Sequence, residues 1–145
     1  MFLYNEVQKR EANQERVRVG LIGAGKFGSM FLSQAPFTIG LEVRSIVDIS
    51  VENAKKNCRD VGWTEEQIES VLFFDNLKKM ISQTKIDVLV EATGDPVEGT
   101  KHALIAIEEG LDIVMVNVEA DVLSGPYLAK EADKAGIVYS MAYGD

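Results

Sequence analysis

An apolar stretch runs directly into a glycine-rich motif near the start of the chain, and this junction constrains the fold more than any other sequence feature. Residues 17–22 read Val-Arg-Val-Gly-Leu-Ile, and residues 23–28 follow with the spacing G-x-G-x-x-G. A short apolar run that ends at glycines is typical of a buried β-strand. A helix is predicted to start near Gly25, so a strand, a tight turn and a helix are expected in immediate succession.

Short apolar runs alternate with amphipathic stretches from Arg16 onward. This alternation is typical of parallel strands joined by crossover helices, rather than of a β-sandwich or a helical bundle. Strands are predicted over residues 17–22, 42–47, 71–74, 88–91, 113–116 and 137–140. Helices are predicted to begin near Gly25, Val51, Asn76, Pro96 and Ser124, with C-terminal caps at Gly110 and Gly136. The predicted fold class is therefore α/β: a doubly wound parallel sheet of about six strands (Rossmann) in three α-β-α layers.

Each glycine of the motif has a separate physical role in a phosphate-binding turn. Gly23 lets the chain turn, Gly25 lets the backbone approach a pyrophosphate, and Gly28 lets the helix pack closely on the strand. Lys26 and Phe27 stand between them at the start of the helix, whose unpaired N–H groups and dipole attract an anion. These five positions are predicted to bind a dinucleotide. The alternative is a glycine turn that only joins strand to helix.

An acidic residue stands where the second predicted strand ends. Asp48 lies twenty positions beyond Gly28, where a carboxylate accepts hydrogen bonds from the adenosine ribose of a dinucleotide. The same carboxylate repels the extra phosphate of NADP, so NAD is favoured over NADP as the cofactor unless Lys26 or Arg44 compensates for its charge. The alternative is that Asp48 caps the helix that starts near Ser50.

Residues that follow the fourth and fifth strands are candidates for the same site, because ligands of an open parallel sheet bind beyond the carboxyl ends of its strands. Small residues follow the fourth strand and are predicted to lie beneath a ribose and a nicotinamide: Ala92, Thr93 and Gly94. Asn117 follows the fifth strand and is predicted to form a hydrogen bond with the nicotinamide or its ribose. The alternative is an asparagine that closes its own turn.

No residue of the chain is predicted to be catalytic or to bind a metal ion. His102 lies inside a predicted helix without a His, Cys or acidic partner at a metal-ligand spacing. This pattern is typical of a surface histidine or of one whose side chain is satisfied within the helix layer. Glu119 and Asp121 are predicted to be solvated or to cap a helix, because nothing in the sequence places a substrate between them.

Length and charge narrow the classes of partner. With 145 residues, the chain is predicted to form one dinucleotide-binding domain over residues 16–145, preceded by an N-terminal arm over residues 1–15 that is expected to be helical. The net charge of -8 argues against a nucleic-acid or membrane-surface partner. Cys58 is the only cysteine, and no signal peptide or membrane-spanning run is recognisable in the sequence, so a cytoplasmic location is expected.

Three stretches together resemble the N-terminal NAD(P)-binding domain of homoserine dehydrogenase and its relatives. They are the glycine motif, the run Asp-Val-Leu-Val-Glu-Ala-Thr-Gly over residues 87–94, and the helix and strand that lead through residues 109–117. Homoserine dehydrogenases usually carry a lysine directly after the asparagine that ends this last stretch, whereas this chain has Val118 and then Glu119. Residues 117–123 are more similar to the homoserine dehydrogenase-like oxidoreductases that carry a C-terminal SAF domain.

The resemblance implies the cofactor-binding part of an NAD(P)-dependent oxidoreductase that acts on a small polar carbonyl or alcohol. Enzymes of this family place their catalytic and dimer-forming residues in a following domain. The resemblance therefore implies that this chain is inactive alone and that the full-length protein is a homo-oligomer. A second hypothesis is a regulatory module that binds the dinucleotide as a redox sensor. A third, a domain that has lost its cofactor, is disfavoured because the three glycines and Asp48 are present.

Overall fold

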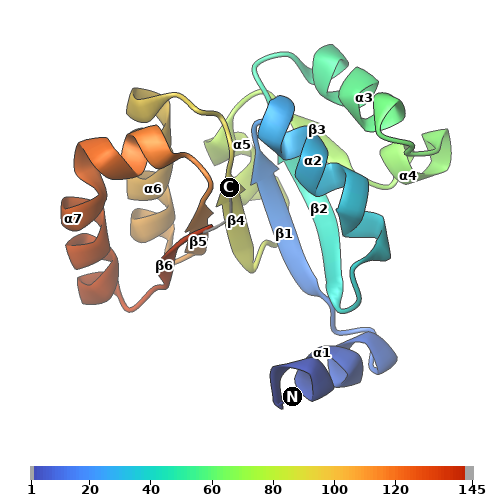
Figure 1. Ribbon diagram of the computed structural model, residues 1–145, viewed down its shortest axis with the longest axis horizontal. Coiled ribbons are helices and arrows are strands. Elements are labelled where there is room, and N and C mark those ends of the chain that lie inside the picture. The colour runs from blue at the N-terminus through green and yellow to red at the C-terminus, as the bar shows by residue number, and fades with distance from the viewer. Residues whose placement is uncertain (1, 143–145) are drawn as a thin grey trace.

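Six parallel strands form one sheet in the computed structural model, which describes residues 2–142 (Figure 1). The strands are β1 (Val17–Ile22), β2 (Leu41–Val47), β3 (Leu72–Phe74), β4 (Val88–Glu91), β5 (Asp112–Met115) and β6 (Tyr139–Met141). Their order is β3-β2-β1-β4-β5-β6, and neighbouring strands all run parallel. The order reverses between β1 and β4, where ligands of such sheets bind. The predicted Rossmann sheet is confirmed; the predicted domain end, residues 143–145, lies outside the described residues.

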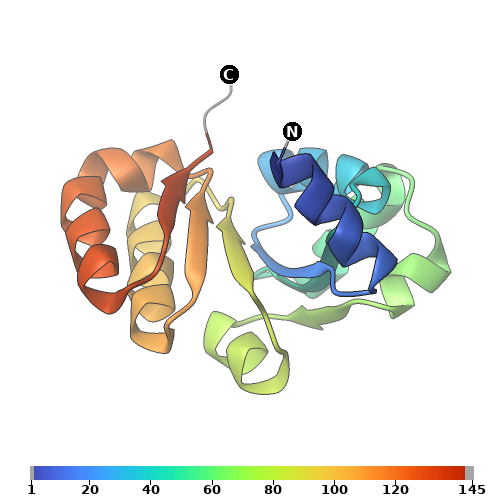
Figure 2. The ribbon, with the colours of Figure 1, turned by 90° about the horizontal axis from the view of Figure 1, so that it is seen from below.

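Helices cover both faces of the sheet. They are α1 (Phe2–Ala12), α2 (Lys26–Gln34), the 3-10 helix η1 (Ala35–Phe37), α3 (Val51–Asp60), α4 (Glu65–Glu69), α5 (Leu77–Gln83), α6 (Pro96–Glu109) and α7 (Val118–Ala135). Figure 2 shows α6 and α7 on the opposite side of the sheet from α2. Adjacent residues of β1 face the two layers: Leu21 joins the apolar cluster with α2, α3 and α4, and Ile22 joins the cluster with α5, α6 and α7. Burial on both faces explains why the central strands read as continuous apolar runs.

The helix α7 begins at Val118 rather than near Ser124, so the predicted start was wrong. The side chain of Asn117 accepts a hydrogen bond from the backbone N–H of Ala120 at 3.0 Å and caps the helix. Pro126 lies inside the helix and donates no N–H to the turn before it. That turn contains Val122, which is 79% exposed, so water reaches the turn that lacks the bond. Ser124 followed by Pro126 has the pattern of a helix N-terminus, and this pattern led to the wrong predicted start.

The first helix after the glycine motif buries a different face from the one its spacing predicts. The spacing of Phe27, Met30 and Phe31 predicts that these three side chains pack against the sheet. In the structure Gly28 and Leu32 are the buried residues of α2. Phe31 packs, partly buried, against the core as predicted, whereas Phe27 and Met30 are more than half exposed. Close packing at Gly28 turns the helix so that Phe27 faces the carboxyl edge of the sheet, where it lines a cleft.

The helix α1 contacts the edge of the sheet through the acidic side chain of Glu11 and through Val7, which lies directly against Gly40. Figure 1 shows α1 at the edge where β1 begins, opposite to the edge where the strands end. The carboxylate of Glu11 accepts hydrogen bonds from Nε of Arg16 at 2.9 Å and from the backbone N–H of Gly40 at 2.8 Å. No residue of α1 is buried, and an isolated helix of 11 residues is marginally stable in water. The Glu11 contacts therefore anchor the arm.

The anchoring of α1 is expected to depend on pH. The hydrogen bond from Arg16, followed by the one from the Gly40 amide, lowers the pKa of Glu11 from 4.5 to about 2. Because folding lowers this pKa, ionised Glu11 stabilises the docked arm above pH 4.5, and the contribution is lost as the pH falls toward 2. Hydrogen exchange, corrected for intrinsic rates, should show α1 amides losing protection in this range before β1 amides do. A Glu11→Gln variant should show weak protection of the α1 amides both above pH 4.5 and near pH 2. Protection of α1 that does not change with pH in the parent chain would contradict the role of Glu11 as the anchor of this helix.

Candidate functional site

The glycine turn after β1 packs closely against its neighbours at Gly23 and Gly28 and faces open space at Gly25. Gly23 has a φ of +91°, and its N–H donates to the carbonyl of Val47 at 2.8 Å. A Cβ on Gly28 would overlap the carbonyl oxygen of Gly23, so the start of α2 lies directly on the turn. By contrast, a Cβ on Gly25 would meet no atom within 4 Å. The turn therefore leaves an open cradle where the unpaired N–H groups of the α2 N-terminus begin.

Asp48 ties the end of β2 to this turn. One carboxylate oxygen accepts a hydrogen bond from the backbone N–H of Ala24, and the other accepts one from the backbone N–H of Ser50, each at 2.9 Å. The carbonyl of Ala24 in turn accepts from the side chain of Asn57 at 2.7 Å. Ser50, not Asp48, caps α3 by accepting from the N–H of Asn53. Asp48 thus has the predicted position at the carboxyl end of β2 and does not serve as the helix cap.

The turn after β4 is organised by a buried acid. The side chain of Glu91 is fully buried, and its Oε1 accepts a hydrogen bond from the hydroxyl of Thr93 at 2.6 Å and forms a second one with Nδ1 of His102 at 3.2 Å. Gly94 adopts a left-handed φ of +75°. Asp95 then caps α6 by accepting from the N–H groups of residues 97 and 98. These contacts hold the backbone of residues 92–94 beside the glycine turn.

A cleft of about 740 Å³ opens between these two turns, α5 and α6. Its lining contains eight of the residues predicted from the sequence: Gly23, Gly25, Lys26, Phe27, Asp48, Ala92, Thr93 and Gly94. Gly28 lies behind the turn, where it makes the helix contact described above. The opposite wall of the cleft was not predicted from the sequence. It is formed by the N-cap of α5 and by side chains of α5 and α6: Asn76, Leu77, Lys78, Glu98, Lys101, His102 and Ile105. No local motif marks these positions, because each sits on an ordinary amphipathic helix.

Asn117 does not line the cleft. Its side chain is 1% exposed, and its amide donates to the carbonyl of Asp95 at 2.8 Å while its oxygen caps α7. A Cβ on Gly99 would collide with this amide, so α6 and α7 approach each other closely here. The polar atoms of Asn117 are thus used inside the protein. The structure matches the alternative in which the asparagine closes its own turn, and the predicted contact with a nicotinamide is not supported by this position.

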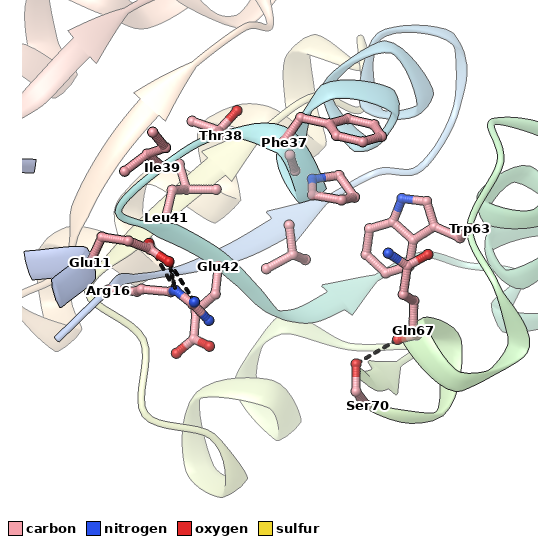
Figure 3. A pocket seen from close by; sticks show the side chains of 13 residues that line it. Glu11, Arg16, Phe37, Thr38, Ile39, Leu41, Glu42, Trp63, Gln67 and Ser70 are labelled. Carbon is pink, nitrogen blue, oxygen red and sulfur yellow. Dashed lines mark hydrogen bonds and ion pairs between the residues drawn. The ribbon is translucent and has the colours of Figure 1, made fainter. Parts of the chain in front are cut away.

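A second cavity of about 300 Å³ lies at the opposite edge of the sheet (Figure 3). Figure 3 shows Glu11 and Arg16 joined on one side and Trp63 and Gln67 on the other. Polar groups that line this second cavity already form bonds within the protein. Nε1 of Trp63 donates to the carbonyl of Leu32 at 2.7 Å, and Arg16 forms an ion pair with Glu11. The larger cleft at the carboxyl edge is therefore the candidate site.

Other chemistry is poorly supported in the part of the chain that the structure describes. Within residues 2–142 no three His, Cys, Asp or Glu side chains gather closely enough to hold a metal ion. Cys58 lies on the buried face of α3, and this burial raises its pKa to about 11, which leaves the thiol protonated at neutral pH. Over the same range, no helix combines the length and the apolar character needed to cross a membrane.

The fold and the cleft define a dinucleotide-binding domain of the Rossmann class. The sequence model of the family "Homoserine dehydrogenase, NAD binding domain" matches residues 19–140. The chain belongs to this family. No curated protein matches the sequence.

Solved dehydrogenase structures share the fold. The WlbA dehydrogenase from Chromobacterium violaceum, solved with NADH and UDP-GlcNAcA, has a TM-score of 0.69 and 19% identity over 88% of this chain and 35% of its own. The myo-inositol dehydrogenase from Lactobacillus casei, solved with NAD(H) and myo-inositol, has a TM-score of 0.68 and 17% identity over 88% of this chain and 36% of its own. At these identities the likeness establishes the fold alone. The chain spans about a third of the length of these structures.

Proposed function

We propose that the cleft at the carboxyl edge binds a nicotinamide dinucleotide, with NAD favoured over NADP. The observation that carries this proposal is the open cradle in front of Gly25, which stands at the N-terminus of α2 and which any side chain would fill. Backbone N–H groups and the helix dipole attract a pyrophosphate there despite the net charge of -8. Lys26 lines the cleft beside the same cradle and adds a positive charge.

The remaining parts of a dinucleotide fit the cleft in a definite order. With the pyrophosphate at Gly25, the adenosine ribose lies at Asp48, and the nicotinamide half extends toward Thr93 and Gly94. Both oxygens of Asp48 accept one backbone hydrogen bond each and retain a second lone pair that a ribose hydroxyl can use. Arg44 pairs with Glu42 at 2.7 Å and does not line the cleft, so it is not placed to offset the charge of Asp48.

The chain, in this proposal, is the cofactor-binding part of a homoserine dehydrogenase-like oxidoreductase. A bound nicotinamide supplies or accepts a hydride, and the residues of this chain bind and orient it. The greater length of the solved relatives supports a further domain that holds the hydride acceptor and a proton donor. One relative binds myo-inositol, a polyol, which supports a small polar alcohol or carbonyl as the substrate class.

We place the chain nearest to the SAF-domain subgroup of this family. Residues 117–123 support this placement, because Val118 stands where homoserine dehydrogenases usually carry a lysine. The same family assignment supports a homo-oligomeric full-length protein, and the single cysteine supports a location in the cytoplasm. Reading the gene beyond residue 145 tests the placement, which predicts a further domain and then a SAF domain in the same frame.

An Asp48→Asn substitution is expected to shift the cofactor preference toward NADPH. The substitution removes the charge that repels a 2′-phosphate and keeps one oxygen to accept from Ala24 or Ser50. We expect the ratio of NADPH to NADH affinity to rise about tenfold, or about 1.4 kcal/mol. Calorimetric titration of the parent chain and of the Asp48→Asn variant with each cofactor measures this ratio.

The matched control is Asp60→Asn, which removes the same charge from α3. Asp60 pairs with Lys56 at 2.7 Å and does not line the cleft, so its substitution should leave the ratio unchanged. Equal ratios in the Asp48→Asn variant and the parent chain would remove Asp48 from the ribose site.

A further inference from the structure

The outer face of the first half of α7 is apolar although it is exposed to solvent. The helix α7 is the outermost helix on its side of the sheet (Figure 1, Figure 2). Four large apolar side chains in this half are more than half exposed: Val118, Val122, Leu123 and Tyr127. Pro126 is exposed among them. The solvent side of a surface helix ordinarily carries polar residues, so this face has the composition of a contact surface.

Helical spacing gathers the centre of this face into a narrow line. Side chains at positions i, i+4, i+7 and i+11 lie along one side of an α-helix. At this spacing α7 carries four exposed residues, which we call the α7 stripe: Glu119, Leu123, Pro126 and Lys130. Val122 and Tyr127 border the stripe on opposite sides. The stripe therefore has charges of opposite sign at its two ends and an apolar centre, over a length of about 17 Å.

Neither charged end of the α7 stripe is neutralised within the part of the chain that the structure describes. Glu119 and Lys130 form no ion pair there, whereas Lys134, one turn further on, pairs with Glu131 at 2.9 Å. Glu119 and Lys130 are about three turns apart, so they cannot pair with each other in one helix. A matching surface needs a cation opposite Glu119, an apolar centre and an anion opposite Lys130. A copy of α7 that runs in the opposite direction has this order.

We propose that the α7 stripe is the contact surface of a homodimer in which two copies of α7 pack antiparallel about a two-fold axis. The axis passes between residues 124 and 125. Glu119 of each copy then lies opposite Lys130 of the other, and Leu123 lies opposite Pro126, so one rotation satisfies both copies. Parallel pairing is disfavoured, because it sets Glu119 against Glu119 and Lys130 against Lys130.

The dimer contact is separate from the cleft. No residue of α7 lines the cleft, so the inference goes beyond the proposed function and does not depend on it. Two facing helices of about three turns bury less than the about 1,600 Å² of a standard interface, so we expect a weak dimer with a dissociation constant on the order of 100 µM. Val122 remains at the border of the contact, where water still reaches the turn before Pro126.

Sedimentation velocity of the 145-residue chain tests the dimer directly. Between about 10 µM and about 1 mM, the weight-average sedimentation coefficient should rise from that of a monomer to that of a dimer. A Leu123→Asp variant places a charge at the apolar centre of the stripe and should weaken the association at least about tenfold. Because Leu123 is exposed, this variant should keep the thermal unfolding midpoint of the parent chain.

Two charge-reversal variants test the antiparallel pairing. Glu119→Lys sets lysine against lysine at both ends of the contact, and Lys130→Glu sets glutamate against glutamate, so each variant alone should remain monomeric over the same concentrations. An equimolar mixture of the two should associate, because a lysine of one variant then faces a glutamate of the other at both ends. The matched control is Lys56→Glu on α3, in the other helix layer, which changes the net charge as Lys130→Glu does and should dimerise like the parent chain.

A parent chain that stays monomeric over the whole range would overturn the proposal and would indicate that a different protein surface covers the stripe. Association that survives unchanged in Leu123→Asp would place the contact elsewhere. Charge-reversal variants that associate alone, or that fail to associate when mixed, would overturn the antiparallel arrangement. Restored association in the mixture also guards against misfolding, because unfolded chains carry no α7 stripe.

Discussion

A Gly25→Val variant should stay folded and lose its affinity for the dinucleotide. A Cβ at this position meets no protein atom within 4 Å, so we expect the fold to tolerate the change. The added methyl groups occupy the cradle in which the pyrophosphate would contact backbone N–H groups. We expect the affinity for NADH to fall at least about 100-fold, or about 2.7 kcal/mol.

Two measurements on the same sample separate these effects. Thermal unfolding should place the midpoint of the Gly25→Val variant within about 4 °C of the parent, since about 1 kcal/mol corresponds to such a shift in a domain of this size. Titration with NADH should show the loss of binding, and a Gly25→Ala variant should show an intermediate loss. A folded Gly25→Val variant with parental affinity would remove the glycine turn from the binding site.

A Gly28→Ala substitution, three residues further on, should have the opposite result. A Cβ here overlaps the carbonyl oxygen of Gly23 and lies 2.9 Å from its carbonyl carbon, and both are backbone atoms that cannot rotate away. The start of α2 must then move off the turn, which also displaces Leu32 from the core. We expect a loss of about 3 kcal/mol or more in the free energy of unfolding, a large share of the total for a single domain.

Chemical denaturation measures this loss. The midpoint for Gly28→Ala should fall clearly below that of Gly25→Ala, which adds the same single methyl group within the same motif. Equal midpoints for the two variants would contradict the close packing of α2 on the turn. The pair therefore separates the glycine that serves the ligand from the glycine that serves the fold.

Much of the fold could be predicted from the sequence because the central strands β1 and β4 are largely buried on both faces. Such strands read as short apolar runs, and the helices between them are marked by end signals such as Gly110 and Gly136, which adopt the left-handed φ of C-terminal caps. The start of α7 could not be predicted from these signals. Asn117 caps that helix from the end of β5, and Pro126 inside the helix favoured a later start.

The sequence predicted the residues that line one wall of the cleft and not those of the opposite wall. Its glycine turn and Asp48 belong to a contiguous motif with a physical reason for each position, so they are visible in the sequence. The opposite wall comes from α5 and α6, which reach the cleft through the packing of the whole sheet. Glu91 and His102 are eleven residues apart, and only the turn of the chain after β4 brings them together. The sequence predicted a surface histidine or one satisfied within the helix layer, whereas the structure pairs Nδ1 of His102 with the acid at the end of β4.

Cofactor binding by this chain is the central claim, and calorimetric titration with NADH and, separately, with NADPH tests it most directly. We expect a single site for NADH and weaker binding of NADPH, by about tenfold or about 1.4 kcal/mol. The Gly25→Val variant, folded in the same buffer, should show no heat of binding. Absence of binding to both cofactors by the folded parent chain, or binding that survives in Gly25→Val, would contradict the account.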